Sequence, residues 1–143
     1  YYPDSVALNY GTASGLVSSM QAADGTYYTL NEATGAPGFQ GDFTFVNVTE
    51  NVHQLTFKGR YQGNSAHAVE VQAYDFDASA WVDLRATTKD LEHATADYYR
   101  VFNFPGTLSR FRDGSNNLKI RISHTTSGVA GHYCYIDELR VRT

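Results

Sequence analysis

The sequence is poor in several residue types, and each shortage narrows what the chain can be. A single cysteine, Cys134, excludes an intrachain disulfide, so packing has to stabilise the fold. No apolar run approaches the ~20 residues that span a bilayer, and no charged and then apolar leader precedes Tyr1, so we expect no membrane insertion. Only 11 Lys and Arg residues are present, without a clustered basic stripe, and the formal net charge is −4. A nucleic-acid partner is therefore not expected.

Aromatic residues, in contrast, are abundant. The chain has 11 Tyr and 8 Phe but one Met, a composition that favours pleated, half-buried surfaces over helices. A length of 143 residues fits one domain, and we expect residues 1–143 to form it. Because the sequence starts at Tyr1 and not at Met, we interpret it as a processed form or as a module cut from a longer protein.

Apolar and polar residues alternate in many short segments that turn signals separate. Phe39, Phe43 and Phe45, for example, alternate with polar residues, which is typical of a sheet with one dry and one wet face. Such segments predict about eight or nine strands, and only residues 89–96 could form a short helical turn. The main segments are residues 27–30, 39–45, 55–62, 69–74, 81–84, 98–104, 118–122 and 133–141. The pattern predicts an all-β fold, an antiparallel two-sheet β-sandwich.

The last predicted strand changes the phase of its alternation part-way along. Cys134 and Ile136 share one face, whereas Leu139 and Val141 continue in the other phase. A β-bulge at residues 137–138 reconciles the two halves, and it places two adjacent carboxylates at an irregular point of the sheet. This position is the best lead to chemistry in the chain.

A series of short motifs extends over nearly the whole chain. The motifs are Gly15-Leu16-Val17-Ser18-Ser19, Ala23-Asp24-Gly25-Thr26-Tyr27-Tyr28, Tyr61-Gln62-Gly63-Asn64, Tyr74-Asp75, Trp81 and Tyr135-Ile136-Asp137-Glu138-Leu139. In this order they resemble the galactose-binding-like jelly-roll modules, which occur as carbohydrate-binding modules and as appended domains of phage and other secreted or surface proteins. The resemblance implies jelly-roll topology for the sandwich. Such a resemblance supports an inference about the fold of this chain more strongly than one about its activity, because one fold hosts many functions.

The resemblance also implies a structural calcium ion near the terminal strand. Asp137 or Glu138 stands at the matching position, and Asp24 is a second contributor if the first and last parts of the fold lie together. Calcium takes about 6–8 oxygen ligands, so one strand cannot supply the whole site. The alternative is that Asp137 caps the bulge while Glu138 pairs with Arg140 or Lys119 on an exposed face.

A carbohydrate site needs aromatic faces that stack on sugar C–H groups and polar side chains that bind hydroxyls. Trp81 is the only indole and follows a polar turn. Arg60, Gln62, Asn64 and His67 gather around one strand end and its loop. We take these five residues as the candidate carbohydrate-binding set.

Aromatic side chains in β-proteins more often fill the core than form a ligand platform. Tyr61, Tyr74 and Tyr98 could join the sugar site only if their side chains face outward. For Trp81 the core interpretation is the stronger alternative, so the loop residues are the ones less committed to packing.

Catalytic patterns are weak by comparison. Asp75 and Asp77 have the spacing that places two carboxylates on one strand face, as glycoside hydrolysis requires, but aspartates in a turn explain them better. The five histidines show neither H-x-H nor H-E-x-x-H spacing, and no serine lies in a G-x-S-x-G motif. We therefore expect no enzymatic activity.

Two function classes remain open. The first is a non-catalytic carbohydrate-binding or adhesion module, displayed on a virion as part of a decoration, fibre or tail protein, or on a secreted surface protein. Its partners are glycans or polysaccharides, and its location is extracellular or on the virion surface. The alternative is a structural domain whose faces contact neighbouring subunits of a virion or surface assembly without glycan binding, which requires a broad patch of about 800 Å² per partner.

Overall fold

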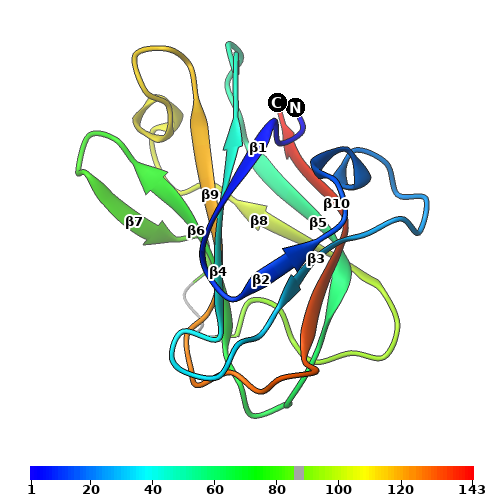
Figure 1. Ribbon diagram of the computed structural model, residues 1–143. Helices are drawn as coiled ribbons and strands as arrows, with labels where there is room; N and C mark the ends of the chain where they lie inside the picture. Colours follow the sequence, from blue (N-terminus) through cyan, green and yellow to red (C-terminus); the bar gives the residue numbers. More distant parts are fainter. Residues whose placement is uncertain (86–88) are drawn as a thin grey trace.

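The computed structural model describes residues 1–85 and 89–143, and these form ten strands in two five-stranded antiparallel sheets (Figure 1). The strands are β1 (Ser5–Tyr10), β2 (Thr12–Ser14), β3 (Tyr28–Asn31), β4 (Phe39–Phe45), β5 (Gln54–Gln62), β6 (Val69–Asp75), β7 (Ala80–Asp83), β8 (Tyr98–Asn103), β9 (Leu118–His124) and β10 (Tyr133–Arg142). Two short 3₁₀ helices, η1 (Val17–Met20) and η2 (Leu108–Phe111), are the helical elements of the described residues. The predicted all-β sandwich is confirmed.

Successive strands in the middle of the chain alternate between the two sheets. The first sheet has the order β1-β4-β9-β6-β7 and the second has the order β2-β3-β10-β5-β8. The chain therefore wraps around the core as a jelly roll. The two ends of the chain lie side by side (Figure 1), because the amino group of Tyr1 donates to the carbonyl of Val141 at 2.8 Å.

The core lies between the two sheets and is built from the inward phase of each strand. On β4 the side chains of Phe39, Phe43 and Phe45 are fully buried, as the alternation predicts. The buried apolar side chains on β5 are Leu55, Phe57 and Tyr61. Those on β10 are Cys134, Ile136, Leu139 and Val141. Most polar side chains of these strands are at least partly exposed, with Thr56, Asp137 and Glu138 as buried exceptions. Burial of the apolar set is the main stabilising contribution to the fold.

The predicted bulge in the last strand is present. β10 pairs with β5 throughout its length, and the register shifts between Ile136 and Glu138. Gly59 lies opposite Ile136, directly beside this shift, with a φ angle of 151°. A Cβ at Gly59 would lie 2.0 Å from the carbonyl oxygen of Tyr135, so only glycine lets the two strands approach this closely.

Two features differ from the sequence-based expectations. Residues 89–96 form no helical turn: they are irregular, with bends and with isolated bridges from Leu91 to Val69 and from His93 to Tyr61. Burial of Leu91 against the core accounts for this conformation. Strands β1 and β2 were not predicted. No helix among the described residues has the length and apolar character to cross a membrane.

Candidate functional site

The outward face of the second sheet carries a group of tyrosines interleaved with polar side chains. Burial of Tyr61 and Cys134 turns their neighbours Arg60 and Tyr135 outward, and Arg60 is in register with Tyr135 across β5 and β10. We call this surface the Arg60 face and define it by Tyr27, Arg60, Gln62, Asp97, Tyr99, Tyr133 and Tyr135. The described residues enclose no pocket, so a ligand would lie on an open surface.

Arg60 is held in place by an acidic side chain and two rings. Its Nη1 lies 2.5 Å from Oδ1 of Asp97, and the Tyr27 hydroxyl donates to the other Asp97 oxygen at 2.8 Å. The guanidinium carbon lies 4.2 Å from the centre of the Tyr135 ring and 5.3 Å from that of Tyr27. These contacts fix a planar cation over an aromatic base, a geometry that leaves little rotamer freedom to lose on binding.

The tyrosines of the Arg60 face contact one another. Tyr135 lies edge-on to Tyr27 at 5.5 Å between ring centres, and Tyr133 lies 5.7 Å from Tyr135. On the neighbouring strand β8, Tyr99 is 60% exposed, and the ammonium of Lys58 lies 5.8 Å from its ring centre. The face therefore offers half-buried rings at its centre and one largely exposed ring at its edge.

The structure brings together only two of the five predicted carbohydrate-binding residues. Arg60 and Gln62 lie on the same face of β5, and Nε of Arg60 donates to Oε1 of Gln62 at 3.5 Å. Asn64 is exposed in the following loop, where its Oδ1 accepts from the backbone N–H of Ala66 at 2.9 Å. His67 points elsewhere, into a cluster at one end of the sandwich. Alternation along β5 found the first pair, whereas the loop could not be placed from sequence.

Trp81 lies on the outward face of the first sheet and belongs neither to the core nor to the Arg60 face. It is half-buried, its ring lies edge-on to Tyr74 at 5.1 Å, and the guanidinium of Arg121 lies 4.0 Å from its ring centre. Arg121 is in turn paired with Asp42 at 2.7 Å. One side of the indole is thus already occupied by a fixed cation.

The other tyrosines singled out from the sequence do not reach the Arg60 face either. Tyr61 is fully buried, and Tyr74 stands beside Trp81 on the other sheet. Tyr98 packs partly against the core, and burial raises the pKa of its hydroxyl to about 12. The rings that line the face are Tyr27, Tyr99, Tyr133 and Tyr135, which the sequence analysis did not select.

The residues predicted to bind calcium already form hydrogen bonds or ion pairs with other groups of the protein. Oδ1 of Asp137 accepts from the backbone N–H of Gly25, so the early turn does meet the last strand. Its Oδ2 lies 2.5 Å from the ammonium of Lys58, and this hydrogen bond raises the pKa of Lys58. A calcium ion requires several oxygens around it, whereas here an ammonium group holds the position beside the buried carboxylate.

The remaining two predicted ligands have partners of their own. Asp24 accepts from the backbone N–H of Thr26, which lowers the pKa of Asp24. Glu138 accepts from the hydroxyl of Tyr2 at 3.4 Å rather than from Arg140 or Lys119. As they stand, Asp24, Asp137 and Glu138 do not fit a calcium ion, and the calcium site stays a prediction.

Asp75 supports a turn, as its sequence context indicates. Its buried Oδ1 accepts from the backbone N–H groups of Asp77 and Ala78, both at 3.0 Å. Its Oδ2 accepts from Nε of Arg110 at 2.7 Å, and the Arg110 guanidinium holds the pKa of Asp75 below its usual range. A buried carboxylate that is saturated in this way stabilises the loop between β6 and β7.

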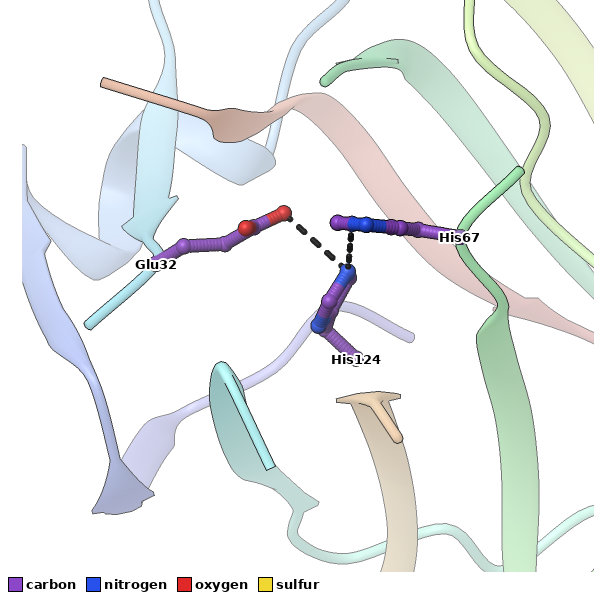
Figure 2. A group of neighbouring side chains, drawn as sticks. All are labelled: Glu32, His67 and His124. Atoms are coloured by element: carbon purple, nitrogen blue, oxygen red, sulfur yellow. Dashed lines mark hydrogen bonds and ion pairs between the residues drawn. The ribbon is translucent and has the colours of Figure 1, made fainter. Parts of the chain in front are cut away.

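His67 enters a buried polar cluster that sequence spacing did not reveal. Figure 2 shows Glu32, His67 and His124 converging from three separate segments. Nε2 of His124 lies 2.9 Å from Nδ1 of His67 and 3.2 Å from Oε1 of Glu32. Burial lowers the pKa of His124, which favours its neutral form.

With this geometry established, the chain can be compared with known proteins. No protein-family model and no curated protein sequence matches it. A family 4 carbohydrate-binding module is 12% identical, with 98% of this chain and 87% of that chain covered and a TM-score of 0.55. A family 35 module from an environmental isolate is 13% identical, with 99% and 91% covered and a TM-score of 0.54.

A third solved structure is module CBM32-1 from a family 31 glycoside hydrolase of Clostridium perfringens, which is 12% identical, with 99% and 96% covered and a TM-score of 0.53. The chain has the jelly-roll fold of carbohydrate-binding modules. The predicted resemblance is thereby confirmed at the level of fold.

Proposed function

We propose that residues 1–143 act as a non-catalytic carbohydrate-binding module and that the glycan binds on the Arg60 face. The observation that supports this most is the strand register, which places Tyr135 beside Arg60 and Tyr133 beside Gln62. The same register places Tyr99 on the neighbouring strand, beside Lys58. Tyrosine rings stack on the C–H groups of a pyranose, while guanidinium and amide groups hydrogen-bond its hydroxyls. The fold shared with carbohydrate-binding modules supports the same conclusion.

The Arg60 face suits a sugar better than the surface around Trp81. One side of the Trp81 indole is covered by Arg121, and that guanidinium is already bound to Asp42. Tyr99, in contrast, is 60% exposed at the edge of the Arg60 face. Arg60 covers Tyr135 and is bound to Asp97 in a similar way, so the exposed ring of Tyr99 is what distinguishes the Arg60 face.

An open face without a pocket binds a single sugar weakly. Many copies on one particle raise the overall avidity, so display on a virion or on a secreted surface protein makes a shallow site useful. We therefore retain extracellular or virion-surface display as part of the proposal, with host or environmental glycans as partners. Nothing in this arrangement requires a catalytic carboxylate pair.

A glycan array with the multimerised chain tests the proposal. We expect saturable binding to one glycan class, and Tyr99→Ala should weaken that binding about tenfold or more, because it removes the accessible ring. Tyr10→Ala is the matched control, since Tyr10 is 51% exposed but lies on β1 of the other sheet. Equal loss in both variants, or none in either, would refute the Arg60 face as the site.

The assembly alternative also has an observation in its favour. Edge strand β8 exposes Tyr99 together with Val101, which is 48% exposed, and apolar side chains on an edge strand can meet a neighbouring subunit. Two results together would favour assembly over glycan binding. The wild-type chain would bind no glycan on a broad array, and it would self-associate in a concentration-dependent way that Val101→Lys abolishes.

A further inference from the structure

The cluster of Glu32, His67 and His124, which we call the Glu32 cluster, links the two sheets at one end of the sandwich (Figure 2). Glu32 follows β3 of the second sheet, whereas His124 is the last residue of β9 in the first sheet. His67 precedes β6 in the first sheet. One potential ligand atom from each side chain lies within 4.8 Å of the other two, and the side chains of Glu32 and His124 are fully buried.

The hydrogen bonds around His124 determine which ring nitrogen carries its proton. Nδ1 lies 3.0 Å from the carbonyl oxygen of Thr126, which can only accept, so Nδ1 is the protonated nitrogen. In the neutral ring, Nε2 is then unprotonated, and its lone pair is directed toward Glu32 and His67. A backbone carbonyl that fixes the tautomer in this way is the usual outer contact of a metal-binding histidine.

Glu32 is oriented just as firmly. Its Oε1 accepts from the Tyr61 hydroxyl at 2.5 Å, and its Oε2 accepts from the backbone N–H of Val129 at 2.7 Å. Both carboxylate oxygens are thus held in fixed positions. Nε2 of His124 lies 3.2 Å from a carboxylate oxygen of Glu32 and 2.9 Å from Nδ1 of His67, so a cation placed among these three atoms would have three ligand atoms close by.

Two of the three ligand-atom separations are close to those around a small transition-metal ion, and the third is at most 4.8 Å. Zn²⁺ bonds to His nitrogen and carboxylate oxygen at about 2.0–2.2 Å, which separates tetrahedral ligand atoms by roughly 3.3–3.5 Å. The observed separations from His124 Nε2, 3.2 Å to Glu32 and 2.9 Å to His67, need to open by only a few tenths of an ångström. Imidazole and carboxylate are ligands that zinc accepts readily, whereas calcium prefers oxygen alone.

A third imidazole, that of His132, stands beside the cluster. The buried Nδ1 of His132 makes no hydrogen bond within the described residues and lies 3.4 Å from Oε2 of Glu32. Its ring centre is 6.0 Å from that of His67. His132 is thus within reach of the open coordination position that three ligands leave.

We propose that Glu32, His67 and His124 form a structural binding site for a divalent transition-metal ion of the Zn²⁺ class, with His132 available as a fourth ligand. The ion ties β3 of the second sheet to β9 and to the start of β6 in the first sheet. It cross-links the sandwich in a chain whose single cysteine cannot. The site is separate from the Arg60 face and does not depend on glycan binding.

Metal uptake by the purified, chelator-stripped chain tests this inference. We expect one Zn²⁺ per chain by equilibrium dialysis and a rise in Tm of about 5–10 °C at a hundredfold excess over Kd. His67→Ala, a half-buried position, should abolish both effects, whereas the exposed His53→Ala should retain them. Absence of stoichiometric uptake by the wild-type chain, or equal uptake by the two variants, would overturn the assignment.

A spectroscopic measurement on the wild-type chain covers the case in which His67→Ala fails to fold. The Zn K-edge X-ray absorption spectrum of the loaded chain should show imidazole ligands and a first shell of nitrogen and oxygen at about 2.0–2.1 Å. A first shell without imidazole would contradict the proposal, because it would place the ion at surface carboxylates.

Discussion

Trp81, the only indole of the chain, shows that residue type alone does not predict where a side chain lies in the fold. Trp81 was a candidate both for the core and for the sugar site, yet it is half-buried on the outward face of the first sheet, against Arg121 and Tyr74. Its burial comes from two neighbouring side chains and not from the interior. Its contribution to stability should accordingly be that of a surface contact.

Replacement of Trp81 by Ala should therefore cost less stability than replacement of a core ring. We expect about 1–2 kcal/mol for Trp81→Ala, from the lost contacts with Arg121 and Tyr74, against about 3–5 kcal/mol for Phe43→Ala. Chemical denaturation of both variants measures the difference. An equal loss in the two variants would mean that Trp81 contributes to the core after all.

Asp137 gives a second prediction at the residue scale. Asp137→Ala removes the acceptor of the Gly25 N–H group and the partner of Lys58, so we expect a loss of about 1–3 kcal/mol. Because the partner is an ammonium group, the loss should be the same in Ca²⁺ and in EDTA. The exposed Glu50→Gln serves as a control for a general charge effect.

A loss that appears only in the presence of Ca²⁺ would contradict this account of Asp137. It would show that a calcium ion displaces Lys58, as the resemblance to jelly-roll modules implies. Thermal unfolding in the two buffers distinguishes the outcomes.

The tyrosines of the Arg60 face illustrate what the sequence contained and what it did not. Burial of Cys134 and Ile136 was predicted, and the same alternation turns Tyr133 and Tyr135 outward. The sequence therefore contained the information that Tyr133 and Tyr135 face outward. Asp97, the ion-pair partner of Arg60, is brought to this face by the register between distant strands, which no local sequence pattern specifies.

At the scale of elements, strands with one buried face were predictable and exposed edge strands were not. β4 alternates strictly, and β5 does so apart from the buried Thr56, so the buried face of each strand was assigned correctly. β1 and β2 lie at sheet edges with almost every residue exposed or half-buried, and such strands carry no apolar period to detect. The bulge of β10 was predictable because two apolar phases meet within one strand.

The pairing of β5 with β10 depends on Gly59. We expect Gly59→Ala to cost about 2 kcal/mol or more, since the added Cβ would lie 2.0 Å from the Tyr135 carbonyl oxygen. Gly114→Ala is the matched control, because a Cβ there meets nothing within 4 Å. Equal stability of the two variants in urea would show that the strands can separate at the bulge without cost.

The loop between β6 and β7 should be sensitive to acid. The pKa of Asp75 lies below its ordinary value because of Arg110, so the unfolded chain binds this proton more readily than the folded chain. The resulting stability is complete above the ordinary aspartate pKa, near pH 4, and is lost as the pH falls further. Asp75→Asn keeps an oxygen for the turn but loses the ion pair.

We therefore expect Asp75→Asn to unfold at a lower temperature than the wild-type chain at pH 7, with the gap narrowing between about pH 4 and pH 2. Tm measured across this range tests the sign. A gap that stays constant or widens in acid would show that the ion pair with Arg110 does not stabilise the fold.

At the scale of the whole molecule, the two sheets have different outer surfaces. The second sheet presents linked tyrosines with Arg60, whereas the first presents Trp81 under Arg121 beside Asp42. The Glu32 cluster joins the sheets at one end and shares no residue with either surface. This separation allows glycan binding and metal binding to be tested independently on the same chain.

The measurement that tests the central claim most directly is an NMR titration of the ¹⁵N-labelled chain with the glycan class that the array selects. The account predicts shift changes centred on Arg60, Tyr135 and their neighbours on β5, β8 and β10, with the amides around Trp81 unchanged. Saturable shift changes around Trp81, without shift changes on the Arg60 face, would contradict glycan binding on the Arg60 face.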